Sequence, residues 1–313
     1  MVFTTLFAFL TMMLLTPARS ATKMQQYPRL ERAAQKDRVL IVAPHIDDEA
    51  IGAGGYAIDA IANGAEVYIV FLTAGDCSRF SARILNKTAA PTASGYLSVG
   101  RTRIAEAKTA MRLIGVPEDH FFVLGYPDRG LKPILDNRRS IVRSRGTREQ
   151  SVPYADAMSP GATYSFESLM SDMTRVLEMT RPTTVIAPVA FDLHPDHSAA
   201  AEITDLALER EQIQPERLGY LVHMSRIPTW FVNKPARALL PPTRMQSYAW
   251  TTYPLSARVQ QAKNDLLMTY KSQRPYVFML RNAFVRTNEL FFVQPRPAAM
   301  VGSPAPARLQ IAR

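Results

Sequence analysis

Apolar runs and helical patterns alternate along most of the chain. Five segments are apolar, rich in β-branched or aromatic residues and without polar alternation, which predicts strands covered on both faces. The predicted strands are residues 37–45, 65–75, 120–126, 183–189 and 219–224. The predicted helices between them are residues 49–63, 98–116, 165–179 and 198–210.

This alternation predicts an α/β fold. Strands separated by helices favour a Rossmann-like, doubly wound, mainly parallel sheet with helices on both faces, in which ligands bind at the carboxyl ends of the strands. We expect this domain to cover residues 36–293. Residues 294–313, rich in Pro and Ala, are expected to form a disordered tail.

Two long segments, residues 77–96 and 128–162, interrupt the pattern at those strand ends. Loops of this length in a compact domain are usually functional lids or disordered insertions. The second segment carries seven Lys or Arg residues from Arg129 to Arg148, which should concentrate positive charge near that edge of the sheet.

The composition is ordinary for a globular protein, with 47% hydrophobic and 20% charged residues, and this excludes disorder of the whole chain. The net charge of +10 would suit an anionic partner, but no zinc-finger spacing, aromatic RNA-binding motif or basic heptad repeat supports nucleic-acid binding. The single cysteine, Cys77, cannot form an internal disulfide.

Residues 1–20 contain an apolar run from Val2 to Leu15, followed by Pro17 and small residues ending at Ser20. This pattern predicts a secretory signal peptide, and therefore a periplasmic or extracellular protein with no stable membrane span after cleavage. No Lys or Arg precedes the apolar run, so a short uncleaved anchor is the alternative.

The first predicted strand leads directly into His45, Asp47, Asp48 and Glu49. One Asp would be enough to cap the next helix, whereas three adjacent carboxylates repel one another unless a cation lies among them. Residues three apart can converge in such a turn, so His45 and Asp48 could bind one ion while Asp47 projects beside it.

The fourth predicted strand leads in the same way into His194 and His197. Because adjacent strand ends meet at one edge of the sheet, the two segments together predict one metal centre. Three ligands of imidazole and carboxylate type favour one catalytic Zn²⁺ per chain over a structural zinc, which normally has four ligands. Asp47 could then take a proton from water, and a free histidine could assist the oxyanion or the leaving amine, which suits hydrolysis of an amide or ester.

These motifs resemble the LmbE-like, or PIG-L, family of zinc-dependent N-acetylglucosaminyl de-N-acetylases. The resemblance rests on APHIDDEAIGAGG at residues 43–55 and HPDH at residues 194–197. Further matches are FLTAGD at 71–76, Arg103 with Glu106, LGYPDRGL at 124–131, YKSQ at 270–273 and NELFF at 288–292.

The resemblance implies a role for each matching residue. The zinc ligands would be His45, Asp48 and His197, with Asp47 as general base and His194 assisting the oxyanion or leaving group. Arg103 and Asp128 would line the sugar pocket, with a surface ion pair or a turn cap as the alternative. The substrate would be an N-acetylated amino sugar, a glycolipid or a glycan.

Two residues of the first motif, Ile46 and Glu49, need separate interpretation. Ile46 stands where the family usually has Pro, but the polar groups all remain, so we expect activity to survive. Glu49 either begins the helix or orients a metal ligand.

Two other functions compete with hydrolysis. Glycines at residues 52–55 follow a strand, as in nicotinamide-binding proteins, but Ala57 stands where the third glycine of that motif would be. The second alternative is a non-catalytic protein that uses the metal only to hold a glycan. The intact Asp47 argues against it.

Overall fold

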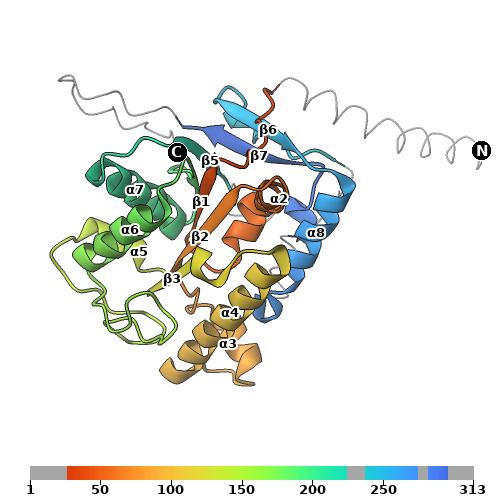
Figure 1. Cartoon of the computed structure of the whole chain (residues 1–313). Helices are drawn as coiled ribbons and strands as arrows, with labels where there is room; N and C mark the ends of the chain where they lie inside the picture. Colours follow the sequence, from red (N-terminus) through yellow and green to blue (C-terminus); the bar gives the residue numbers. More distant parts are fainter. Residues whose placement is uncertain (1–26, 224–236, 274–280, 295–313) are drawn as a thin grey trace, which may run out of the picture.

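Seven strands form one sheet in the computed structural model, which describes residues 27–223, 237–273 and 281–294 (Figure 1). The strand order is β3-β2-β1-β4-β5-β7-β6. Strands β1 to β5 pair in parallel, while β7 is antiparallel to both β5 and β6. The strands are β1 (Arg38–Ala43), β2 (Glu66–Thr73), β3 (Phe121–Tyr126), β4 (Thr184–Pro188), β5 (Glu216–Tyr220), β6 (Trp250–Pro254) and β7 (Asn288–Val293).

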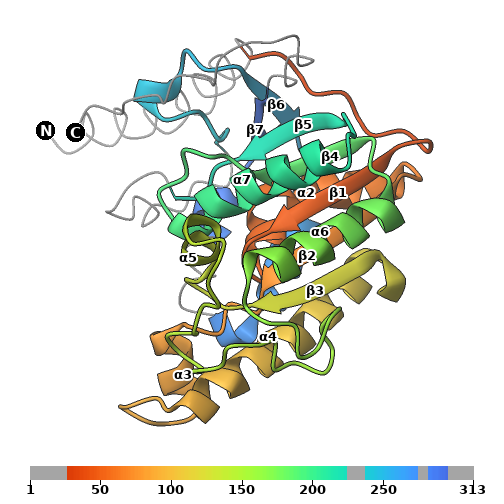
Figure 2. The same cartoon turned by 90° about the vertical axis from the view of Figure 1, so that its left-hand side faces the viewer.

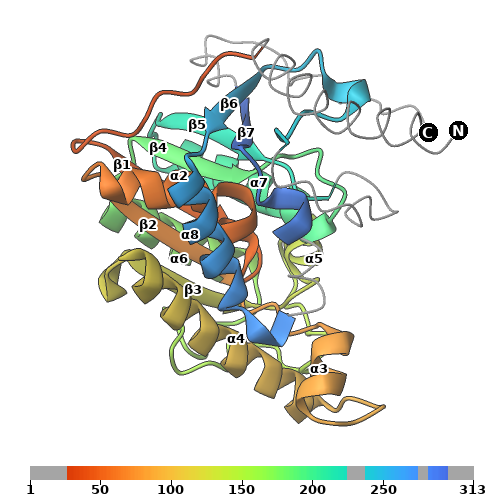
Figure 3. The same ribbon diagram turned by 90° about the vertical axis from the view of Figure 1, so that its right-hand side faces the viewer.

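Helices cover both faces of the sheet, so the predicted doubly wound α/β fold is confirmed. One face carries α5 (Leu131–Asp136), α6 (Phe166–Thr180) and α7 (Pro195–Arg210), as Figure 2 shows. The other carries α2 (Asp48–Ala62), α4 (Ala93–Ile114) and α8 (Ala257–Met268), as Figure 3 shows. The short helices are α3 (Arg79–Leu85), η1 (Glu118–His120), η2 (Thr243–Met245) and η3 (Lys271–Gln273).

The central strand β1 explains why the sheet needs both layers. Val39, Leu40, Ile41 and Val42 are all fully buried, so side chains on both faces of the strand are covered. The chain leaves β1 towards β2 and β3 on one side and later returns to place β4 and β5 on the other. The direction of winding therefore reverses between β1 and β4, and a crevice is expected at their carboxyl ends.

The interruptions of the pattern are ordered rather than disordered insertions. Residues 77–96 contain α3 and the first turn of α4, whose start is set by Thr92, the side chain of which accepts the Gly95 N–H. Residues 128–162 contain α5, and Tyr154 in this segment is buried and donates to Asp76.

A buried ion pair between α8 and β7 also forms hydrogen bonds with the backbone of α2. Glu289 in β7 accepts the backbone N–H groups of Gly55 and Tyr56, both at 2.7 Å, and lies 2.5 Å from Lys263 Nζ in α8. Lys263 also donates to Ile51 O at 2.9 Å. The helix that begins at the site is therefore held by polar contacts from two later segments.

The predicted signal peptide at residues 1–20 and the predicted tail beyond Gln294 lie outside the described residues. Of the helices that are described, none has the length and apolar character needed to cross a membrane.

Candidate metal centre

The turn after β1 brings His45 and Asp48 together. Asp48 Oδ2 accepts the His45 N–H at 2.9 Å and lies 3.0 Å from His45 Nδ1. Burial alone would raise the pKa of Asp48, but the charge and hydrogen bonds of His197 and His45 hold it well below its usual range. The carboxylate is therefore ionised, as a metal ligand must be.

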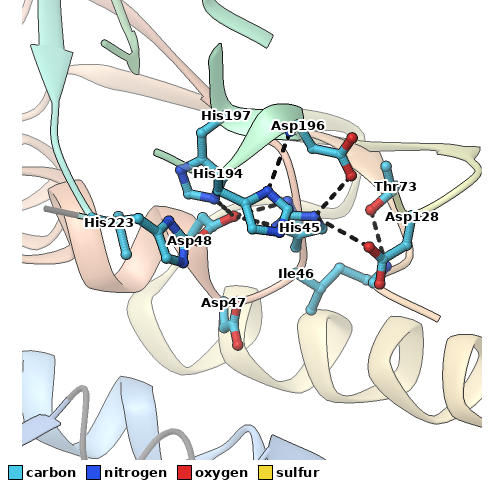
Figure 4. Close-up of polar contacts among 12 residues, drawn as sticks. His45, Ile46, Asp47, Asp48, Thr73, Asp128, His194, Asp196, His197 and His223 are labelled. Atoms are coloured by element: carbon cyan, nitrogen blue, oxygen red, sulfur yellow. Dashed lines mark hydrogen bonds and ion pairs between the residues drawn. The ribbon is translucent and has the colours of Figure 1, made fainter. Parts of the chain in front are cut away.

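His197, in the first turn of α7, completes this group. Its Nε2 lies 3.1 Å from Asp48 Oδ2, so one carboxylate oxygen lies next to both imidazoles (Figure 4). His197 is fully buried, and neither ring nitrogen makes a well-aligned hydrogen bond to any described residue. Buried polar atoms are almost always paired, and two imidazoles with a carboxylate are a donor set that divalent metals prefer. These residues fit a metal ion.

His194 lies against the same group. Its ring centroid is 4.9 Å from that of His45, and the ligand atoms of His45, His194 and His197 all lie within 4.8 Å of one another. His194 caps α7, because its Nδ1 accepts the Asp196 N–H at 3.2 Å. Burial and the charges of His45 and His197 lower the pKa of His194 to about 4, so the ring is neutral and carries its proton on Nε2.

Asp47 points away from the histidines, towards α4 (Figure 4). Its Oδ1 lies 3.2 Å from Arg103 Nη2, and burial raises the pKa of Asp47 to about 7 while the Arg103 charge limits the rise. Asp47 has φ of +119°, a conformation that costs free energy in a non-glycine residue and is found mainly at functional sites. The backbone is therefore strained at the residue whose carboxylate pairs with Arg103.

Ile46 and Glu49 support the turn on either side of Asp47. The Ile46 side chain is fully buried in the main core and its carbonyl accepts from Arg103, so the turn is held without the family's proline. Glu49 Oε2 accepts the Asp47 N–H at 3.1 Å, and its Oε1 accepts from the Tyr270 hydroxyl. Glu49 therefore holds the backbone of Asp47 from the first turn of α2, which begins one residue earlier, at Asp48.

A cavity of about 300 Å³ opens onto these residues. Its lining includes His45, Asp47, Asp48, Arg103, Asp128 and His194, which are six of the seven predicted site residues; His197 lies beneath them. Arg103 is 4% exposed, so a surface ion pair is the wrong interpretation for it. Asp128 accepts the Cys77 N–H at 2.9 Å and lies 3.5 Å from His45 Nε2.

Three further residues of the centre were missed by the sequence analysis: Asp192, Asp196 and His223. Asp192 is buried, with one oxygen 3.3 Å from His197 Nδ1 and the other 3.2 Å from His223 Nδ1. Asp196 Oδ2 lies 3.3 Å from His45 Nε2. Each candidate ligand histidine thus has a carboxylate behind it, an arrangement that fixes the ring and raises its basicity.

Asp192→Asn should weaken metal binding about 10- to 100-fold, the usual effect of removing such a carboxylate. The charge next to His197 would be lost while the side-chain volume stays the same. Competition with a chromophoric chelator measures the affinity. Asp172→Asn is the matched control, because Asp172 is also buried but accepts from Tyr126 and Ser159, away from the centre. Equal affinities in the two variants would contradict the role of Asp192.

The sequence matches the profile of a known protein family. Residues 40–208, just over half of the chain, match the profile of the family described as PIG-L, GlcNAc-PI de-N-acetylase. A 1D-myo-inositol 2-acetamido-2-deoxy-alpha-D-glucopyranoside deacetylase from Kribbella flavida is 29% identical over 217 residues, which are 67% of this chain and 64% of that protein. The protein with the same description from Actinosynnema mirum is 28% identical over 190 residues, 59% of each chain. The matches thus span less than two thirds of these relatives.

Two solved structures share the fold. The conserved protein TT1542 from Thermus thermophilus is 21% identical, with a TM-score of 0.50 over 86% of this chain and 100% of that chain. The A40926 pseudoaglycone deacetylase Dbv21 is 17% identical, with a TM-score of 0.53 over 85% of this chain and 100% of that chain. At these identities the likeness concerns the fold alone.

Proposed function

Because this chain belongs to the PIG-L family, described as GlcNAc-PI de-N-acetylase, we propose that it is a metal-dependent N-deacetylase. The substrate would be an N-acetylglucosamine-type amino sugar or glycoconjugate. One observation carries the proposal: His45 and His197 meet at a single oxygen of Asp48, and Asp47 lines the same cavity as His45 and Asp48. The deacetylase descriptions of the relatives support it.

The metal would be held by His45, Asp48 and His197. Two imidazoles and one carboxylate leave a coordination position open, which favours zinc in a catalytic site. A zinc ion polarises a carbonyl group and lowers the pKa of water towards about 7.

The surrounding side chains then have distinct tasks in amide hydrolysis. Asp47, oriented by Arg103, takes a proton from the water whose oxygen attacks the acetyl carbon. His194 Nε2–H donates a hydrogen bond to the oxyanion that forms on the carbonyl oxygen. When the C–N bond breaks, the nitrogen receives the proton from Asp47, and the products are acetate and a free amine.

Release of acetate from N-acetylglucosamine conjugates tests this proposal. The metal-loaded protein should release one acetate per free amine formed, measured with an enzyme-coupled acetate assay and amine labelling. A non-catalytic glycan-binding protein would bind the same conjugates and release none. Binding without acetate release across free sugars, glycolipids and glycans would therefore replace the proposed function with that alternative.

A further inference from the structure

Two histidines of the cavity wall present a hydrogen-bond donor and an acceptor side by side. His194 and His223 both line the cavity, with ring centroids 5.0 Å apart and planes tilted by 37° (Figure 4). We propose that His223 is a further catalytic residue, whose Nε2 accepts a hydrogen bond from the N–H group of the leaving nitrogen once the acetyl carbon has been attacked. This inference rests on the proposed deacetylase function and deepens it.

The buried carboxylate of Asp192 holds both histidines in place. Its Oδ1 accepts the His194 N–H at 2.9 Å and lies 3.2 Å from His223 Nδ1. Its Oδ2 accepts the backbone N–H groups of Val222 and His223, at 3.0 and 3.1 Å. The segments that follow β4 and β5 are also joined directly, because the Leu193 N–H donates to His223 O at 3.2 Å. The two rings are therefore held next to each other at the cavity wall.

These contacts give the two neutral rings opposite tautomers. Asp192 accepts backbone N–H groups on both of its oxygens, as an ionised carboxylate does, so the His223 ring donates to it from Nδ1. The neutral His223 ring then has an acceptor at Nε2. His194 is the reverse, because its Nδ1 accepts the Asp196 N–H and its Nε2 carries the proton. Within the described residues His223 Nε2 has no hydrogen-bond partner, and the side chain is 34% exposed, so this acceptor is available to a substrate.

A planar N-acetyl group does not match both rings at once. Its C=O and N–H bonds point in opposite directions, and rings with centroids 5.0 Å apart leave no room for the amide between them. Attack makes the acetyl carbon tetrahedral and removes the double-bond character of the C–N bond. Rotation about this bond then brings the N–H group to the same side as the oxyanion, so His194 donates to the oxygen while His223 accepts from the nitrogen. A contact that forms only after attack raises kcat and leaves substrate binding unchanged.

The same contact orients the nitrogen for proton transfer. When its N–H group points at His223, the lone pair that forms on the tetrahedral nitrogen points away from the histidines. The carboxylate of Asp47 also points away from the histidines, towards α4 (Figure 4). The proton that Asp47 took from water therefore passes to the lone pair, the C–N bond breaks, and the amine leaves without any proton passing through His223.

An amide and its matching ester test this role of His223 in the metal-loaded protein. Methyl N-acetylglucosaminide has the N–H group, whereas its 2-O-acetyl counterpart has oxygen in place of that nitrogen. His223→Leu should lower kcat for the amide about 10- to 100-fold, the cost of leaving one buried donor unpaired, while KM stays nearly unchanged. The same variant should hydrolyse the ester at the wild-type rate. His223→Gln should recover part of the lost kcat, because its side-chain oxygen is also an acceptor.

Metal analysis and NMR exclude an indirect effect. Both variants should hold as much metal per chain as the wild type, since Asp192 keeps its three backbone N–H donors. His120→Leu is the matched control and should leave both substrates unaffected, because His120 lies in η1 and stacks on Tyr68. Long-range proton–nitrogen correlation spectra, recorded above neutral pH, should show the ring proton of His223 on Nδ1 and that of His194 on Nε2.

The possible outcomes separate this inference from the proposed function. Equal losses for amide and ester, or a rise in KM alone, would overturn the contact between His223 and the nitrogen and keep the deacetylase. A ring proton of His223 on Nε2 would overturn it as well. If the wild type does not hydrolyse the ester, the kcat and KM of the amide and the tautomer of His223 decide. A wild-type protein that releases no acetate from the amide would instead overturn the proposed function.

Discussion

Replacing Asp47 with Asn should lower kcat for acetate release by about 10²- to 10⁴-fold, the contribution typical of a general base. Asn has the same size and tolerates positive φ better than most residues, so the backbone at φ of +119° should keep its conformation. The metal should remain, because the Asp47 carboxylate pairs with Arg103 and not with the histidines. Steady-state kinetics and metal analysis by mass spectrometry measure the two quantities.

Asp119→Asn is the control for this substitution. Asp119 is exposed in η1, at the amino end of β3 and therefore at the opposite edge of the sheet from the site. The kcat of the Asp119→Asn protein should stay within about twofold of wild type, since surface substitutions rarely change the free energy of unfolding by more than about 0.5 kcal/mol. An Asp47→Asn protein as active as wild type would refute the assignment of the base. Loss of metal from that protein would instead make Asp47 a ligand.

The predictable part of this site is local in the chain. His45 and Asp48 are three residues apart in a turn, and His194 with His197 follow a second strand, so spacing and strand order were enough to bring them together. The apolar runs of β1 and β4 mark these strands because both faces are covered. Local sequence pattern and strand order are therefore enough to predict that the candidate ligands lie together. The roles of those residues remain predictions.

His223 was missed because of a strand boundary. The apolar run at residues 219–224 predicts a strand that includes His223, whereas β5 ends at Tyr220, where its pairing with Pro188 of β4 ends. His223 therefore lies past the carboxyl end of β5, the same kind of position as His45 and His194. Asp192 was missed for a different reason: its partners, His197 and His223, come from separate elements, and only the folded chain brings them together.

The C-terminal strands escaped prediction because their polar residues are buried. In β7, Asn288 and Glu289 are 0% and 1% exposed, which hydropathy alone would assign to a loop. Glu289 is compensated by Lys263 and by two backbone N–H groups of α2. A buried charge of this kind is stable only when its partners are present. Those partners are 26 and more residues away in the sequence.

Replacing His197 with Ala should remove the metal and reduce acetate release to background. The variant keeps only His45 and Asp48 of the candidate ligands and also leaves the buried Asp48 and Asp192 without the imidazole between them. His120→Ala is the matched control, because His120 is the one histidine of the chain outside the centre and stacks on Tyr68 with ring centroids 4.1 Å apart. Metal per chain, measured by mass spectrometry, should be near zero in the first variant and near one in the second.

Chelation of the wild-type protein separates loss of metal from loss of fold. The treated protein should keep its circular dichroism spectrum, lose acetate release, and regain it when zinc is added back. The His197→Ala protein should not regain acetate release when zinc is added, because it lacks one of the three candidate ligands. A metal-free wild-type protein that releases acetate at the full rate would refute the metal centre, whatever the variants do. If other divalent ions restored acetate release and zinc did not, the metal centre would stand but its ion would not be zinc. Imidazole and carboxylate ligands also suit several other transition metals.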